Sequence, residues 1–294
     1  MTTSPTTTLG VPDLRATDAG ERHALVAGLL EDLDALPGQQ AVLLRIAQLS
    51  DDEDCSLSAL ADVCAADPPY AARLLSLANS SYYGRRGAVT SLSGGINVIG
   101  REAVRCLALT TALGMTGAKS TVPAQFWSRA ALTASASQLV ARSLGAPAGD
   151  AFCGGLLADV GQALLLTAAP DSYPALMTQR CGADLLAVEL EAYGIGHAEL
   201  GALAMSRVGL PDVLCEAIGG HHTAGLDGEP VLGALARSVH AGSILAHAVD
   251  AGELDEAALG ELVVITDGAL TGADGSRILL QSAAAAAALA VALM

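Results

Sequence analysis

Apolar residues recur along most of the chain at the three- and four-residue spacing of one helix face. In the stretch 22–36, for example, Leu25, Leu29 and Leu33 lie on the same face of a predicted helix. We find no convincing strand pattern, because even residues 262–265, the best candidate, keep a helical spacing. The pattern therefore predicts an all-α protein with helices over residues 22–36, 40–49, 56–65, 67–79, 93–99, 102–113, 126–144, 150–168, 171–180, 183–193, 197–208, 211–220, 231–249, 256–266 and 278–294.

Local start and stop signals support several of these helices. Asp67 precedes Pro68, and this pair is a strong start signal because Asp accepts hydrogen bonds from the free amides while Pro is pre-set for the first turn. Ser91 or Ser93 is a candidate cap for the next helix, and Gly100 is predicted to end it.

The chain is predicted to form two packed helical lobes. Residues 1–20 mix Thr, Pro, Gly and Asp without periodicity and are expected to be a disordered tail. The Gly-, Ser- and Thr-rich run at 117–123 is the best boundary, so the first lobe covers 21–118 and the second 119–250. Residues 251–294 are expected to form a helical extension that covers the second lobe.

Composition and charge narrow the class of partners. Of the 294 residues, 52% are hydrophobic but only 3% are aromatic, so the core must consist mainly of Ala, Leu, Val and Ile. The formal net charge is −16, and a protein this acidic repels phosphate backbones and anionic lipids. We therefore expect neither bulk nucleic acid nor a membrane among its partners.

Cysteine usage and the chain ends indicate a cytoplasmic protein. None of the six cysteines forms a C-x-x-C pair or a zinc-like spacing with histidine, so we expect separate buried thiols in a reducing compartment. The first eight residues lack the basic start and apolar core of a signal peptide. The Ala-rich stretch 278–294 is short and weakly hydrophobic for a membrane span, which favours a buried or self-associating helix.

One acidic residue in an apolar segment is the main candidate for chemistry. Asp159 lies in the segment 152–161, which otherwise holds only small and apolar residues, and a buried unpaired carboxylate is costly. It is therefore a ligand, a partner in a polar network, or exposed. Five more polar residues on nearby predicted helices could join it, either as a metal site within a bundle or as helix caps along a groove; they are His197, Glu199, Glu216, His221 and His222.

A second candidate is the only locally basic and aromatic loop. Tyr82 and Tyr83 precede Arg85 and Arg86, directly after the helix that ends near Asn79. Such a loop could stack a base or dock a partner, or it could be an ordinary surface turn.

These segments together resemble the HDOD domain, the HD-related output domain of bacterial signalling proteins. The resemblance covers about residues 25–250, and its segments follow one another in the family's order. They are Leu36-Pro37, Asp67-Pro68, Arg73-Leu74-Leu75, Ala78-Asn79-Ser80, Tyr83-Gly84, Ile99-Gly100, Phe126-Trp127, Gly155-Leu156-Leu157, Asp159-Val160-Gly161, His197, Gly201, Leu210-Pro211 and His221-His222.

The resemblance implies an HD-like helical bundle in the second lobe with an incomplete metal-ligand set. The family is similar to metal-dependent phosphohydrolases, whose His and Asp residues hold the cations that activate water. Here Arg129 stands where such domains often have a His, and Ala158 stands where the His of the His-Asp pair belongs. We expect Arg129 to neutralise Asp159 in place of a metal. No metal or other cofactor is expected; if a metal is present, the resemblance implies Asp159, His197, His221 and His222 as its ligands.

The function expected from the resemblance is regulatory rather than enzymatic. The chain is predicted to be a non-catalytic pseudoenzyme that binds a signalling protein in trans, or a small ligand such as a nucleotide, through the groove between the lobes. A homodimer is a further expectation. Asn79, Tyr82, Tyr83, Arg85 and Arg86 are the candidate docking residues. The alternatives are a metal-dependent phosphodiesterase acting on a cyclic dinucleotide or nucleotide, and nucleotide or single-strand binding without hydrolysis.

Overall fold

The structure, a computed structural model, is helical throughout its described residues. It describes residues 24, 26–32, 40–84, 87–116, 120, 122–177, 182–223, 233–251 and 254–293, and it has no strand within these ranges. This confirms the all-α prediction. The predicted tail at 1–20 lies outside the described residues, as do Arg85 and Arg86.

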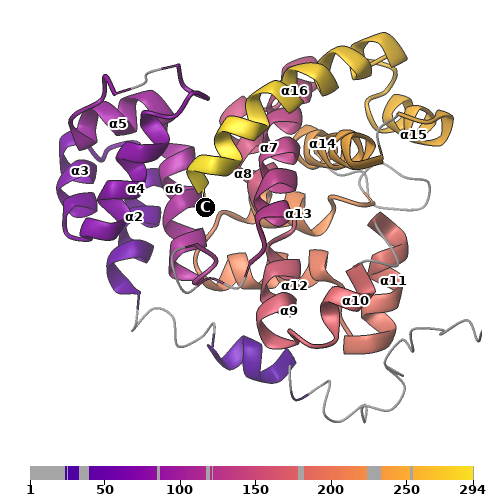
Figure 1. Cartoon of the computed structure of the whole chain (residues 1–294), viewed down its shortest axis with the longest axis horizontal. Coiled ribbons are helices and arrows are strands. Elements are labelled where there is room, and N and C mark those ends of the chain that lie inside the picture. The colour runs from indigo at the N-terminus through magenta and orange to yellow at the C-terminus, as the bar shows by residue number, and fades with distance from the viewer. Residues whose placement is uncertain are drawn as a thin grey trace, which may run out of the picture.

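Among the described residues, the first lobe contains five helices with defined bounds, and residues 26–32 are also helical (Figure 1, indigo to purple). The five helices are α2 (Ala41–Asp51), α3 (Leu57–Ala65), α4 (Pro68–Ala78), α5 (Leu92–Ile99) and α6 (Arg101–Ala112). The predicted caps are confirmed, because the Asp67 carboxylate accepts from the Tyr70 amide at 3.0 Å and the Ser91 hydroxyl accepts from the Gly94 amide at 3.2 Å. Gly100 ends α5 with a φ of 84°, a conformation that favours glycine.

The second lobe is built around the long helix α7. The figure shows α16 crossing α7, with α14 and α15 on one side and α9–α12 below (Figure 1). The helices of the second lobe are α7 (Ala124–Leu144), α8 (Ala148–Leu157), α9 (Val160–Ala168), α10 (Tyr173–Met177), α11 (Gly182–Tyr193), α12 (His197–Arg207), α13 (Asp212–Gly219) and α14 (Ala234–Ala251). The C-terminal extension contains α15 (Glu256–Ile265) and α16 (Gly272–Leu293).

Helix α16 belongs to the predicted C-terminal extension and packs against both α7 and α4. The extension therefore contacts both lobes and not only the second. Among the described residues, the segment Ala148–Ala168 is long and apolar enough to cross a membrane, but 89% of its most apolar part is buried inside the protein. Its hydrophobicity is therefore explained by its place in the core.

Two contacts join α6 of the first lobe to α8 of the second. The buried Arg105 on α6 pairs with Asp51 of α2 and lies 3.4 Å from Asp150 of α8. Cys106 and Cys153, both fully buried, bring their sulfur atoms into contact between the same two helices. Sequence spacing could not predict this contact, because the two cysteines are 47 residues apart and only the packing of α6 on α8 brings them together.

Small residues let the helices around α7 approach closely. A methyl group on Gly155 of α8 would lie 2.8 Å from the Ala134 Cα of α7, and one on Gly242 of α14 would lie 2.8 Å from the Ser137 amide nitrogen. Helix α7 is therefore held between two glycine contacts. The same device joins α9 to α12, where a methyl group on Gly161 would overlap the carbonyl oxygen of His197.

We predict that Gly161→Ala destabilises the protein by about 1–3 kcal/mol, because the new methyl group meets backbone that cannot rotate away. Gly260→Ala is the matched control, since Gly260 lies inside α15 with no atom near the added methyl group. The control should be neutral or stabilising by up to about 1 kcal/mol. Denaturant unfolding followed by circular dichroism measures both, and equal stability of the two variants would contradict the close contact.

Candidate functional site

Asp159 lies at a break between two helices rather than inside one. The sequence predicted a single helix over 150–168, but α8 ends at Leu157 and α9 begins at Val160. The two halves pack against different partners, because Gly155 of α8 contacts α7 while Gly161 of α9 contacts α12. The chain therefore changes its packing partner at Asp159, a residue that is only 6% exposed.

His197 is the first residue of α12 and is held by a buried carboxylate. Glu189 of α11 accepts from the His197 backbone N–H and from its ring Nδ1, each at 2.7 Å. The Tyr173 hydroxyl of α10 donates to the other Glu189 oxygen, and all three residues are fully buried. Because Nδ1 carries the proton, the Nε2 lone pair of His197 faces Asp159 Oδ1 at 3.5 Å.

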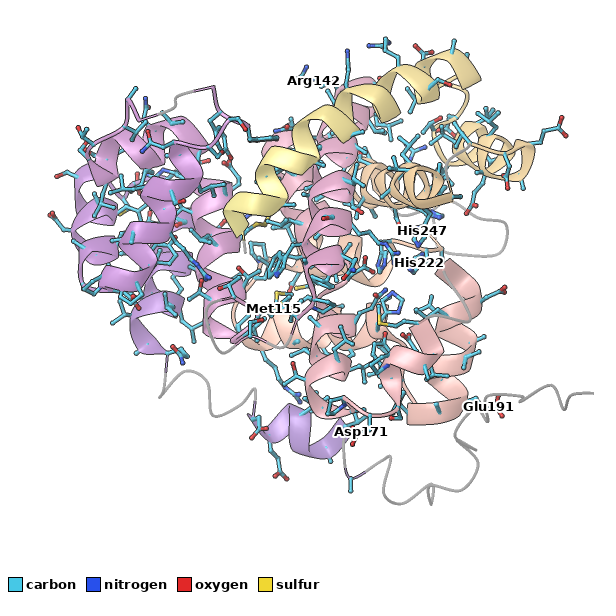
Figure 2. The ribbon with its side chains drawn as sticks, viewed as in Figure 1. Met115, Arg142, Asp171, Glu191, His222 and His247 are labelled. Carbon is cyan, nitrogen blue, oxygen red and sulfur yellow. A yellow bond between two sulfur atoms is a disulfide. The ribbon has the colours of Figure 1, made fainter. Side chains whose placement is uncertain are left out.

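His221 and His222 follow α13 in a turn and complete the group. The His221 Nδ1 donates to the Ile218 carbonyl oxygen at 2.6 Å, which leaves its Nε2 without a hydrogen-bond partner, 3.5 Å from Asp159 Oδ1. The His222 Nε2 lies 3.1 Å from that of His197. Figure 2 shows His222 close to His247 of α14, and their ring centroids are 6.1 Å apart.

The four side chains converge on one point. One ligand atom from each of Asp159, His197, His221 and His222 lies within 4.8 Å of all the others. Gln162, the third residue of α9, bridges two of them, since its amide nitrogen donates to Asp159 Oδ1 at 2.8 Å and lies 3.3 Å from the His197 Nε2. This is the set of residues that the sequence named as ligands in the event that a metal is bound.

Burial and mutual charge set the protonation of this group. Burial would raise the pKa of Asp159, but the contact with His221 and positive charge on His221, His197 and His222 hold it well below its usual range. Burial lowers the pKa of His221 and lowers that of His222 further, which favours neutral imidazoles. An ionised carboxylate among neutral imidazoles requires a cation, either a proton on one ring or a metal ion.

The donor set suits a divalent transition metal. Neutral imidazole and carboxylate are the ligands that Zn²⁺ accepts, and Fe²⁺ and Ni²⁺ also bind imidazole well. The unpaired Nε2 of His221 has a free lone pair at the centre of the group. The Glu189 contact to His197 is the carboxylate–histidine arrangement that orients metal-binding imidazoles. The described residues therefore fit a metal ion.

The remaining candidates lie outside this group or cannot bind metal. Ala158 is 1% exposed and offers only a methyl group. Arg129 is half-buried on α7, but the charges that lower the pKa of Asp159 are those of the histidines. Neutralisation of Asp159 by Arg129 stays a prediction. Glu199 and Glu216 are exposed.

The candidate docking residues are more structural than predicted. The Asn79 amide donates to the carbonyl oxygens of Leu75 and Val89, at 3.0 and 2.8 Å, and its oxygen accepts from the Val89 amide at 3.0 Å. Asn79 therefore closes the base of the loop. Tyr82 and Tyr83 are half-buried rather than displayed on the surface.

Sequence reasoning missed Glu189, Gln162 and Tyr173. A signal existed for Glu189, because it shares a helix face with Leu185 and Ala192, and all three are buried. A carboxylate within an apolar stripe is an anomaly of the same kind that singled out Asp159.

The fold and the family are established by comparison. The HDOD domain family model matches residues 36–224. An HDOD domain protein of Geobacter sulfurreducens superimposes with a TM-score of 0.65 at 20% identity, covering 94% of this chain and 98% of that one. A Shewanella amazonensis SB2B protein, provisionally described as a phosphohydrolase, gives a TM-score of 0.71 at 22% identity, covering 92% of this chain and 99% of that one. At these identities the likeness shows a shared fold.

One relative also matches this chain in sequence. An uncharacterized protein of Treponema pallidum (strain Nichols) is 24% identical over 203 residues, which are 67% of this chain. The matched region spans 40% of that relative's length. Because the family model matches well over half of the chain, the protein belongs to the HDOD domain family.

Proposed function

We propose that this HDOD protein is a non-catalytic regulatory module of signal transduction whose second lobe is stabilised by a buried divalent metal ion. The observation that carries the proposal is the convergence of Asp159, His197, His221 and His222 within 4.8 Å in the interior. The regulatory part of the proposal rests on membership of the HDOD family, and the metal part rests on this geometry.

The closed character of the site supports a structural rather than a catalytic metal. Structural zinc sites take four protein ligands, whereas catalytic sites take three and keep one position for water or substrate. Here four candidate ligands are present, and their exposed fractions are 6% for Asp159, 0% for His197, 0% for His221 and 6% for His222. With a tetrahedral Zn²⁺ bound by these four ligands, a phosphoester would have no open coordination position to occupy.

A metal ion would also compensate buried negative charge. Asp159 and Glu189 are both buried acids, and each buried charge is costly unless a cation or hydrogen bonds compensate it. Glu189 has three donors, from Tyr173 and His197. Asp159 has Gln162 and two imidazole contacts at 3.5 Å, which is weaker compensation. A dication beside Asp159 would stabilise the group most.

The second candidate function is a metal-dependent phosphodiesterase. The metal-ligand cluster favours it, and a structural neighbour is provisionally described as a phosphohydrolase. Against it stands Ala158, which lies where the His of the His-Asp pair belongs and removes one ligand. We therefore rank it below the regulatory role.

Nucleotide or single-strand binding through the tyrosine loop is a weaker candidate. Tyr82 and Tyr83 line a cavity together with Glu102, whose carboxylate would repel phosphate.

A protein partner in trans, self-association and a cytoplasmic location remain part of the proposal. Affinity capture from a native lysate would identify such a partner.

We predict that the purified protein contains about one divalent metal ion per chain, measured by plasma mass spectrometry. Metal added at a hundredfold excess over its Kd should raise the Tm of the stripped protein by about 5 °C or more. His221→Ala should abolish the increment, while His240→Gln should keep it, because His240 pairs with Glu261 on another face of the lobe. Equal increments in both variants would count against this site.

We also predict that the metal-loaded protein does not hydrolyse bis(p-nitrophenyl) phosphate or a cyclic dinucleotide above the buffer rate. The physical reason is the closed four-ligand site, which leaves no position for an activated water. Product release is followed by absorbance or chromatography. Metal-dependent turnover that is lost in Asp159→Asn would reverse the ranking in favour of the phosphodiesterase.

A further inference from the structure

A cavity of about 290 Å³ lies at the junction of the two lobes, away from the metal-ligand cluster. Its walls come from the loop after α4, the α5–α6 corner, α7 and α8. None of its lining residues belongs to the histidine and aspartate group; they are Tyr82, Tyr83, Ile99, Glu102, Ala103, Gln138, Gly149 and Phe152. Ligand pockets begin at about 300 Å³, so this cavity suits a small chemical group rather than a whole nucleotide.

Aromatic side chains are concentrated at this cavity. The chain has only 8 aromatic residues, from 2 Phe, 5 Tyr and 1 Trp, and three of them line the cavity. The rings of Tyr82 and Tyr83 pack edge to face with centroids 4.7 Å apart, and the Tyr82 and Phe152 centroids are 6.3 Å apart. Faces of aromatic rings attract cations through their quadrupole.

One carboxylate completes the lining. Glu102 is the only charged residue among the eight that line the cavity, and two glycines make room for it. A methyl group on Gly149 would lie 2.8 Å from the Glu102 carboxyl carbon, and one on Gly100 would lie 3.1 Å from its Oε2. The carboxylate therefore has a defined position against the start of α8.

The tyrosines are held in place and remain neutral. Asn79 closes the base of their loop with three hydrogen bonds. Burial raises the pKa of both Tyr82 and Tyr83, and the neighbouring Glu102 charge raises that of Tyr83 further. Neutral phenol rings keep their attraction for cations and add no second negative charge.

We propose that this cavity binds a small organic cation, with an ammonium or guanidinium group placed between the aromatic rings and the Glu102 carboxylate. Gln138 offers an amide oxygen as a further acceptor for an N–H donor. The inference deepens the recognition role proposed above, because it names the chemistry of one ligand. It does not depend on the metal ion, so the two proposals can fail separately.

Isothermal titration calorimetry of the full chain tests the proposal. The probes are choline and tetramethylammonium, with 3,3-dimethylbutan-1-ol as the neutral analogue of choline, and N-acetylarginine amide as a mimic of a protein-borne guanidinium. We expect the cations to bind at least about tenfold more tightly than the neutral alcohol. Equal binding of the alcohol, or no cation binding up to millimolar concentrations, would overturn the proposal. Tighter binding of the arginine probe than of choline would identify a partner's side chain as the source of the cation.

Matched variants locate the binding. Glu102→Gln should weaken cation binding about tenfold or more, since it keeps the shape but removes the charge. Asp62→Asn makes the same change of net charge at an exposed site on α3 and should leave binding unaltered. Tyr83→Phe should retain binding and Tyr82→Leu should lose most of it. Asp159→Asn should also retain binding, which separates this site from the metal ion. Unchanged affinity in both Glu102→Gln and Tyr82→Leu would refute the cavity as the site.

Discussion

The backbone contact between α9 and α12 is the constraint on which the metal-ligand cluster depends. The carbonyl oxygen of His197 lies where a side chain of Gly161 would begin, and Gly201 leaves matching room on the other helix. This contact sets the separation of Asp159 from His197. His197 itself makes the contact, and Asp159 is only two residues before Gly161. With any larger residue at Gly161, the carboxylate and the imidazole would move apart.

The cluster places polar groups inside an apolar bundle, so nearly all of their hydrogen-bonding atoms and charges need partners. Glu189 achieves this with donors from Tyr173 and His197, and these contacts also fix which nitrogen of His197 faces the centre. The His221 Nε2 and the Asp159 carboxylate are less fully paired. A partly satisfied network is expensive in a low dielectric, and the proposed metal ion would compensate both the Asp159 carboxylate and the His221 Nε2.

The sequence predicted what depends on local chemistry or on the family pattern. The helices, the Asp67 and Ser91 caps and the Gly100 stop follow from periodicity and backbone chemistry, and the structure has them. The resemblance named the four candidate ligands. It could not name Gln162 or Glu189, because these residues meet the ligands only through packing of α9 and α11. The Cys106–Cys153 contact and the helix break at Asp159 were missed for the same reason: both arise where helices distant in sequence pack together.

Helix α8 connects the two sites physically. Phe152 on this helix lines the inter-lobe cavity, and the same helix leads into Asp159 at its end. Its ten residues span about 15 Å, and Gly155 packs it tightly on α7. A helix in such tight contact moves as a unit, and the proposed metal ion would hold its Asp159 end in place. A closed metal centre at that end would then act as a fixed anchor, against which binding in the cavity alters the relation between the lobes. The proposed regulatory role needs this arrangement more than it needs an open catalytic metal.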